Sequence, residues 1–430
     1  MIDTRYFLAR IRFMALAMVL TFAADALASS PTERVLYSFL TSPDGSVPIS
    51  GLVADNAGNL YGTTSSGGDV AGQFGAIYEL SPPATKGSPW TETVLYRFQG
   101  GSNDGATPIG SLIFDKLGNL YGTTVVGGPQ GWGTVFELSP PAAQGEAWTE
   151  QILFMFPSDA SQGGNPFGRL TFDGAGNLYG TAQFGGSSLG VGTVFQLKPP
   201  AVPGGIWTER DIYTFRPFQN GILDGLYPEN LVFHAGSIYG TTEIGGANDQ
   251  GTVFQLTPKG GVWTETILYN FTGGEGSEPI GALVVDFAGN LYGTAYHGGN
   301  AACANGCGSV FELSPPVTLG DPWLETTLYS FAGGKDGASP YAGVIRDKSG
   351  DLFGSAAAGG SKGQGVLFKL IPPASPAHNW TEVTMHEFQG GSEDGSAPFG
   401  QLILMNGKGF YGTTSAGGTA GLGTVFNLLP

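Results

Sequence analysis

Short runs of apolar, β-branched and aromatic residues follow one another along almost the whole chain, and glycine, proline, asparagine and aspartate separate them. In one full period, residues 94–98 and 111–115 are two such runs, and residues 120–124 and 133–138 are two more. Runs punctuated by turn residues in this way predict strands and hairpins. No helical periodicity of useful length occurs after the first 28 residues. The pattern therefore predicts an all-β protein.

The four-strand pattern occurs seven times. Its core phrase is N-L-Y-G-T-T, followed by a glycine-rich gap and by G-T-V-F-E-L. The aromatic residue of this phrase recurs every 53 to 61 residues, at Tyr61, Tyr121, Tyr179, Tyr239, Tyr292, Phe353 and Tyr411. So regular a period is typical of repeat architectures. Four antiparallel strands without a helix predict a propeller blade, and we expect one seven-bladed β-propeller over residues 29–430.

The two ends of the chain each supply part of a blade. Residues 35–39 form an outer strand with no inner strands before it, and residues 423–428 form a third strand with no outer strand after it. Pairing the N-terminal outer strand with the C-terminal blade would close the ring. Closure would also remove the sheet edges that an open array exposes.

The first 28 residues have a different composition. Arg5, Arg10 and Arg12 precede an apolar run over residues 13–24, and Ala26-Leu27-Ala28 follows. This is the layout of a secretory signal peptide with an A-x-A cleavage site. An uncleaved anchor is the alternative, although the run is shorter than the roughly 20 residues of a membrane span. We expect an exported protein, periplasmic or extracellular, with no membrane insertion after cleavage.

The chain is acidic, with 18 Lys and Arg against 35 Asp and Glu and a net charge of −17. Removal of residues 1–28 would make this −18. Nucleic acids and anionic membranes attract basic surfaces, so the charge disfavours both as partners. It is compatible with cations, neutral sugars or basic proteins.

The phrase L-Y-G-T-T…G-G…G-T-V-F resembles the tandem GloVer repeats of bacterial exported proteins, the choice-of-anchor tandem repeat family. The resemblance covers nearly all of residues 33–430. It implies export and a repeat-built extracellular body, and it supplies no catalytic residues.

Acidic residues recur in the D-G-x-x-P turns that join each outer strand to the next inner strand. They are Asp44, Asp104, Asp224, Asp336 and Asp394, with Glu275 and Glu278 in blade 5. All should lie on the face that carries the glycine-rich loops. Calcium takes several oxygen ligands and is the one cofactor that such a ring makes possible. Asp-Gly is also favourable turn chemistry in its own right.

Binding residues are expected where the repeats differ, because shared residues serve the shared blade. The loops of this face carry Trp132 in blade 2, Phe184 in blade 3, and Tyr296 and His297 in blade 5. Together with Asp104, Asp336 and Asp394, these side chains form the predicted binding surface, with ordinary loop variation as the alternative. Cys303 and Cys307 share one loop and are predicted to form a disulfide, with free thiols as the alternative.

Catalytic sets are absent from the pattern. The four histidines, His234, His297, His378 and His386, fall in separate parts of the repeat and predict no metal site. No Ser-His-Asp or Cys-His set stands out. We therefore expect a monomeric, non-catalytic binding or scaffold propeller that engages a glycan, a cation or an envelope protein. A carbohydrate-active enzyme that uses two face carboxylates and a purely structural surface protein are the alternatives.

Overall fold

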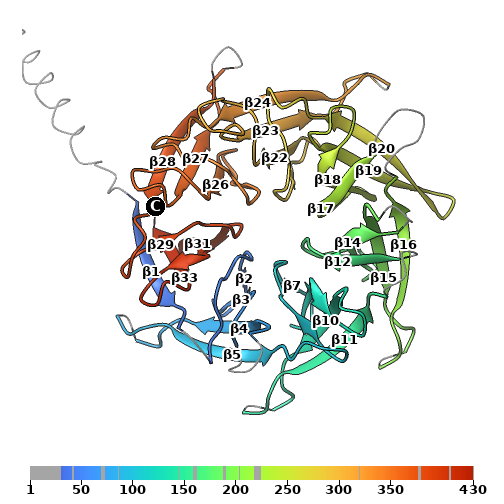
Figure 1. Ribbon diagram of the computed structural model, residues 1–430, viewed down its shortest axis with the longest axis vertical. Helices are drawn as coiled ribbons and strands as arrows, with labels where there is room; N and C mark the ends of the chain where they lie inside the picture. Colours follow the sequence, from blue (N-terminus) through green and yellow to red (C-terminus); the bar gives the residue numbers. More distant parts are fainter. Residues whose placement is uncertain are drawn as a thin grey trace, which may run out of the picture.

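The computed structural model describes residues 31–40, 43–68, 73–85, 87–143, 145–157, 162–186, 190–202, 204–216, 224–318, 320–375, 379–405 and 408–429. Within these ranges the fold is all-β, and seven antiparallel sheets stand as blades around a central axis (Figure 1). The predicted seven-bladed β-propeller is confirmed. The predicted signal peptide lies outside the described residues. The described part of the chain contains no helix of the length and apolar character needed to cross a membrane.

Each blade runs from an inner strand beside the axis to an outer strand at the rim, and blades are numbered in chain order. Blade 1 contains β2 (Val53–Ala54), β3 (Leu60–Thr64), β4 (Ala76–Ser81) and β5 (Thr91–Arg97); blade 2 contains β7 (Ile113–Phe114), β8 (Leu120–Thr124), β10 (Thr134–Ser139) and β11 (Thr149–Met155). Blade 3 contains β13 (Thr171–Phe172), β14 (Leu178–Gly185), β15 (Thr193–Lys198) and β16 (Thr208–Thr214); blade 4 contains β17 (Gly225–His234), β18 (Ser237–Gly245), β19 (Thr252–Lys259) and β20 (Val262–Asn270).

The remaining blades follow the same order. Blade 5 contains β21 (Val284–Val285), β22 (Leu291–Ala295), β23 (Ser309–Ser314) and β24 (Leu324–Ser330); blade 6 contains β25 (Ile345–Arg346), β26 (Leu352–Ala356), β27 (Val366–Ile371) and β28 (Thr381–Glu387). Blade 7 contains β30 (Ile403–Met405), β31 (Gly409–Thr414), β33 (Thr424–Leu429) and β1 (Thr32–Ser38). Smaller pairings join β12 (Gly163–Pro166) to β14, β6 (Gly105–Ala106) to β9 (Val126–Gly127), and β29 (Gly395–Ser396) to β32 (Ala416–Gly417).

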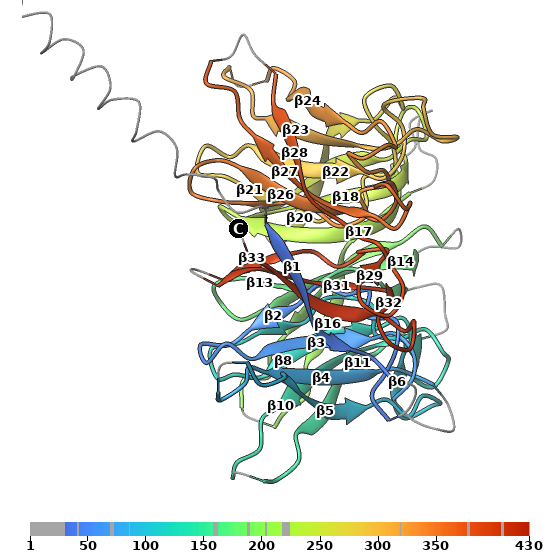
Figure 2. The ribbon, with the colours of Figure 1, turned by 90° about the vertical axis from the view of Figure 1, so that its left-hand side faces the viewer.

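Blade 7 is assembled from both ends of the chain. Strand β1 pairs antiparallel with β33, from Thr32 opposite Leu429 to Ser38 opposite Thr424. Figure 2 shows the blue β1 lying against the red strands of this blade. The predicted pairing of the terminal strands is therefore present, and β33 has a partner on both sides.

Glycine in the L-Y-G-T phrase has a packing reason. A Cβ at Gly180 of β14 would lie 2.4 Å from the ring of Phe195 on the neighbouring β15, where no real atom fits. The other six blades place an aromatic ring over the equivalent glycine in the same way. This ring then packs edge-on against a buried phenylalanine at the end of an outer strand, as Phe156 does against Phe195. The glycine of the L-Y-G-T motif and the aromatic residue of the G-T-V-F motif therefore pack directly against each other.

In each blade a proline lies at or just before the inner strand, and the residue before this proline links the blade to the preceding one. Seven residues that are not glycine occupy this position with φ between 53° and 58°: Val47, Thr107, Asn165, Tyr227, Glu278, Ser339 and Ala397. Such a conformation is unfavourable for L-residues and persists where the surroundings enforce it. The Glu278 N–H donates to the carbonyl of Gln250 in the preceding blade, and its carbonyl accepts from the Tyr296 N–H. These bonds fix the positions of the residues that follow each proline.

Candidate functional site: the mouth of the central channel

The residues that follow the seven prolines line a central channel in two layers. The first layer holds Ile49, Ile109, Phe167, Ile280, Tyr341 and Phe399, and the second holds Gly51, Ser111, Arg169, Asn230, Ala282, Gly343 and Gln401. Blade 4 is one residue shorter here, and its Glu229 is equivalent to the small residues between the layers, such as Ser50 and Ala342. The space between the layers measures about 70 Å³. A water molecule needs about 10–15 Å³ of such space, so this part of the channel holds a few water molecules. A larger ligand would bind at one of the two ends, either at the mouth or in the space of about 340 Å³ beside Arg169 and Gln401.

Glu229 is the one carboxylic acid among the described residues that line this part of the channel. It is 2% exposed, and its side-chain Oε1 accepts a hydrogen bond of 2.8 Å from the Gln183 amide in blade 3. Its backbone carbonyl accepts another from the Thr181 hydroxyl. Burial, with a smaller contribution from the charge of Glu243, raises the pKa of Glu229 to about 8. Near neutral pH the group is therefore mostly a neutral acid that can donate as well as accept a hydrogen bond.

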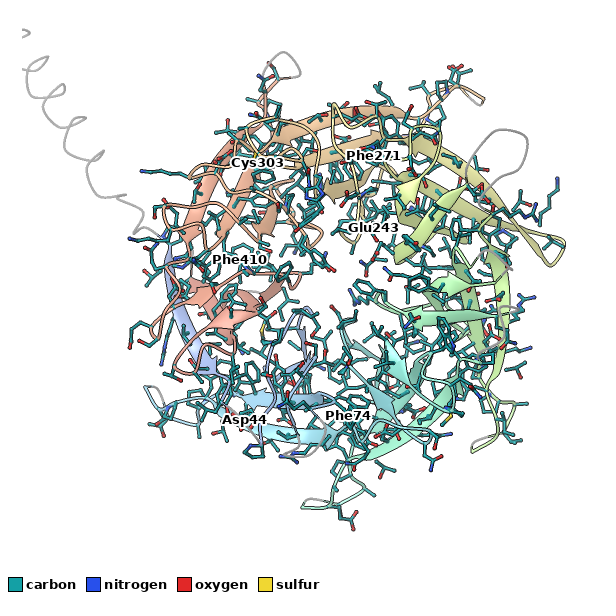
Figure 3. The ribbon with its side chains drawn as sticks, in the orientation of Figure 1. Asp44, Phe74, Glu243, Phe271, Cys303 and Phe410 are labelled. Carbon is teal, nitrogen blue, oxygen red and sulfur yellow. A yellow bond between two sulfur atoms is a disulfide. The ribbon has the colours of Figure 1, made fainter. Side chains whose placement is uncertain are left out.

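Glu243 lies near Glu229, and Glu278 in turn lies near Glu243. Burial and the neighbouring charge of Glu278 raise the pKa of Glu243 above its usual value. The Glu278 carboxylate is 2.9 Å from Nδ1 of His297. Figure 3 shows Glu243 on the inner side of blade 4, toward the axis of the ring. Three carboxyl groups and one imidazole from blades 4 and 5 are therefore gathered in one place.

Aromatic rings border these carboxyl groups. The Tyr296 and Tyr341 rings are perpendicular with centroids 5.8 Å apart, and Tyr341 meets Phe399 edge-on at 4.9 Å. Burial and the charges of Glu229 and Glu243 raise the pKa of Tyr341 well above its usual range, so the phenol stays protonated. We call Glu229, Glu243, Glu278, Tyr296, His297 and Tyr341 the mouth cluster.

The mouth cluster makes the propeller asymmetric. The position of Glu243 is occupied by Ser65, Val125, Gln183, Tyr296, Ala357 and Ser415 in the other blades, and that of Glu278 by Val47, Thr107, Asn165, Tyr227, Ser339 and Ala397. Long polar and aromatic side chains thus come from blades 3 to 5, joined by Tyr341 of blade 6. Small or apolar residues fill the same positions in blades 7, 1 and 2. Polar and aromatic side chains therefore line one half of the mouth, and small or apolar side chains line the other half, which we call the plain half.

The structure brings together some of the predicted site residues. Tyr296 and His297 are in the mouth cluster, in contact with each other at 4.4 Å between ring centroids. Phe184 is 37% exposed beside Gln183, and its ring meets Tyr227 at 5.3 Å. Trp132 packs against the next blade, and its binding role stays a prediction. A Cβ at Gly164 would lie 2.8 Å from its indole, so the ring covers the next blade where only glycine fits.

The carboxylates of the Asp-Gly turns accept hydrogen bonds near the rim, where Figure 3 shows Asp44. Asp104 and Asp394 are buried. Asp104 accepts from the Tyr96 hydroxyl and the Gln99 N–H, and Asp336 accepts from the Tyr329 hydroxyl and the Ala332 N–H. These bonds tie the turn to the end of the outer strand. They do not connect the aspartates with the mouth cluster, and calcium at the turns stays a prediction.

Cys303 and Cys307 are joined by a disulfide in a loop of blade 5. Both sulfur atoms lie against Gly333 at the end of the outer strand, where a Cβ would be 2.6 Å from Cys303 Sγ. The bridge therefore shapes the loop that follows Tyr296 and His297.

Sequence reasoning missed Glu229, Glu243, Tyr341 and Arg169. Arg169 projects into the second layer of the channel, where its enclosure by protein lowers its pKa from the ordinary value. A signal for Glu229 was present. Blade 4 is one residue shorter between its proline and the inner-strand leucine than the other blades, and when the segments are aligned on that leucine the counterparts of Glu229 are Ser50, Gly110, Gly168, Gly281, Ala342 and Gly400.

The family of the chain is evident from its repeats. The model of the Gloeobacter/Verrucomicrobia repeat matches residues 26–206, 207–320 and 302–430. No curated protein sequence matches the chain.

Solved structures are similar to the chain at low sequence identity. The extracellular domain of BT4673 from B. thetaiotaomicron is 10% identical with a TM-score of 0.51, over 92% of this chain and 40% of that one. PorZ, a surface component of the type-IX secretion system of Porphyromonas gingivalis, is 14% identical with a TM-score of 0.42, over 85% and 46%. The gluconolactonase XC5397 from Xanthomonas campestris is 12% identical with a TM-score of 0.41, over 77% and 89%. Similarity at these identities concerns the fold alone.

Proposed function

The chain belongs to the Gloeobacter/Verrucomicrobia repeat family, and from that premise we propose that it is an exported, non-catalytic binding protein whose mouth cluster takes a neutral, hydroxyl-rich ligand, a glycan. The observation that carries this proposal is the concentration of polar and aromatic side chains on one half of the channel mouth. In a structure built from seven similar blades, packing alone gives no reason for that asymmetry.

The chemistry of the mouth cluster supports a glycan. Hydroxyl groups need both donors and acceptors, and protonated Glu229, the Gln183 amide and the Glu243 carboxyl supply them. Tyr296 and Tyr341 offer apolar ring faces beside a polar hydroxyl, a combination that suits amphipathic ligands. The net charge of −17 disfavours an anionic ligand. Because the space below the mouth measures only about 70 Å³, the glycan would lie across the mouth.

One observation favours a second function, glycoside hydrolysis. A glycosidase needs a carboxylic acid with a raised pKa near a second, ionised carboxyl group. Glu229, with its pKa of about 8, has the first property, and Glu278 beside His297 could serve as the second group. In this alternative Glu229 protonates the leaving oxygen of the glycosidic bond.

Thermal unfolding against a panel of neutral envelope and plant glycans tests the proposal. At a ligand concentration of a hundred times Kd, binding stabilises the folded protein by about 2.7 kcal/mol. We expect the Tm of the unsubstituted protein to rise with at least one glycan, and Tyr341→Ala and Glu243→Gln to lower the affinity at least tenfold.

The repeats provide a matched control. Ser65 is the counterpart of Glu243 on the plain half of the mouth, and Ser65→Ala should leave the affinity unchanged. Equal losses from Ser65→Ala and Glu243→Gln would refute a site at the mouth cluster. Release of reducing sugar that stops in Glu229→Gln would establish the hydrolase instead.

A further inference from the structure

A histidine and two carboxylates meet at the rim, away from the channel. They are Glu33 at the start of β1, His386 near the end of β28, and Asp394 in the turn that follows, and one ligand atom of each lies within 4.8 Å of the others. Figure 1 shows β28 and β1 following each other along the rim, one in blade 6 and the other in blade 7. The three side chains therefore span the junction where the N-terminal strand joins the ring.

This junction differs from its six counterparts in one residue. The position of His386 holds Tyr37, Tyr96, Phe154, Tyr213, Tyr269 and Tyr329 in the other outer strands. At the blade 1 junction, for example, the Tyr96 hydroxyl donates to Asp104, and Glu150 of the next blade lies nearby. The glutamate and the acidic turn residue thus recur, whereas the imidazole occurs here alone among the seven positions.

We propose that Glu33, His386 and Asp394 bind a divalent transition metal ion of the zinc type. Imidazole nitrogen with carboxylate oxygen suits such an ion, whereas calcium prefers an all-oxygen shell. The site is independent of the glycan proposed for the mouth cluster.

The separation of the pair His386–Asp394 is compatible with two ligands of one metal ion. Nε2 of His386 is 3.3 Å from Oδ2 of Asp394. A charge-assisted hydrogen bond is usually shorter, at about 2.7–2.9 Å. Two ligands with bonds of about 2.0 Å to a tetrahedral zinc ion are about 3.3 Å apart. The two atoms are in hydrogen-bond contact without an ion, and the same separation would accommodate one metal ion between them.

The surroundings hold the ligands in place and leave one of them unsatisfied. Asp394 accepts backbone N–H bonds from Gln389 and Gly395, both 2.7 Å long, and Phe388 packs edge-on against the imidazole. Outer bonds of this kind orient metal ligands. The Oε1 atom of Glu33 is shielded from solvent and has no hydrogen-bond partner in the described part of the chain, and the same holds for Glu92, Glu150, Glu209 and Glu265 at other junctions. Among the described junctions, only that of Glu33 places an imidazole beside the free oxygen, so that a metal ion could bind both.

The test is a zinc titration of metal-free protein, read by calorimetry and by thermal unfolding. We expect one equivalent to bind and, at a hundredfold excess over Kd, the Tm to rise by about 3 °C for a protein of this size. Calcium at the same concentration should give no rise that depends on His386. His386→Tyr installs the residue that five other junctions carry, so it should fold normally and lose the zinc-dependent rise.

Two further variants separate this site from adventitious zinc. Glu33→Gln should weaken zinc binding at least tenfold, whereas Glu92→Gln at the equivalent blade 7–blade 1 junction, beside Tyr37 and Asp44, should leave it unchanged. Unaltered zinc binding in His386→Tyr, or no binding in the unsubstituted protein, would overturn the proposal.

Discussion

Glu229 stands where the other blades have glycine, serine or alanine, and it places a carboxyl group between the two layers of the channel. Its burial has an energetic consequence that depends on pH. The pKa is about 8 in the fold and 4.5 in the absence of burial. Between these values the folded protein holds a proton that the unfolded chain has released. Stability therefore falls as the pH rises through this window.

Glu229→Gln isolates this contribution. The amide cannot ionise, yet its oxygen can still accept the bond from Gln183. We expect the variant to gain stability over the unsubstituted protein as the pH rises from 5 to 7, by about 1 kcal/mol per pH unit. Urea unfolding at a series of pH values measures the difference. A difference that is constant with pH would mean that Glu229 is ionised in the fold.

Gly180 allows a second test at the residue scale. Gly180→Ala would force a methyl group against the Phe195 ring, at a cost of about 1–3 kcal/mol in the free energy of unfolding. Gly174, in a turn of the same blade, serves as the control, because a Cβ there would meet no atom of the described chain within 4 Å beyond its own neighbours in sequence. Gly174→Ala should change stability by less than about 1 kcal/mol. Similar losses in both variants would contradict the packing reason given for the motif.

At the scale of elements, sequence reasoning succeeded where the period of a pattern determines the outcome. Alternating residues and turn signals gave the four strands of a blade, and the unmatched strands at the two ends gave the β1–β33 pair. The site was harder, because side chains from different blades meet only through the ring. Asp104 and Glu278 occupy related turns, yet one bonds to its own outer strand and the other pairs with His297. Turn chemistry alone does not distinguish the two.

Strand β1 should be essential to blade 7. A variant without Thr32–Ser38 leaves one edge of β33 unpaired, and we expect it to lose roughly 5 kcal/mol or more of stability and to self-associate through that edge. Calorimetry and size-exclusion chromatography measure the two effects. A peptide of residues 31–40 added in trans should restore the Tm, and a scrambled peptide should not. A monomeric variant with an unchanged Tm would show that the pairing is dispensable.

Over the whole molecule, the junctions between blades respond together to pH. Burial, followed by a neighbouring acidic residue, raises the pKa of Glu92 and Glu150 to about 7 and that of Glu209 and Glu265 to about 8. Each folded-state pKa is above the ordinary 4.5. The stability that each group contributes is therefore fully present below pH 4.5, and it is lost as the pH rises toward 7 or 8.

We therefore expect the Tm to be highest near pH 5 and to fall by several degrees by pH 8, in scans that include a chelator. Glu92→Gln combined with Glu150→Gln should make the fall shallower. A Tm that rises over this range would show that these carboxyl groups are ionised in the folded ring.

The origin of blade 7 has a consequence for how the protein is made. Strand β1 leaves the ribosome before the other strands of the ring, and its partner β33 is the last of them to be synthesised. The Thr413 hydroxyl likewise donates to the Ser50 carbonyl across 363 residues of chain. Contacts of such long range form slowly and late. Strand β1 therefore lacks its partner β33 through nearly the whole of translation, and a chain that is truncated before β33 cannot close the ring of blades.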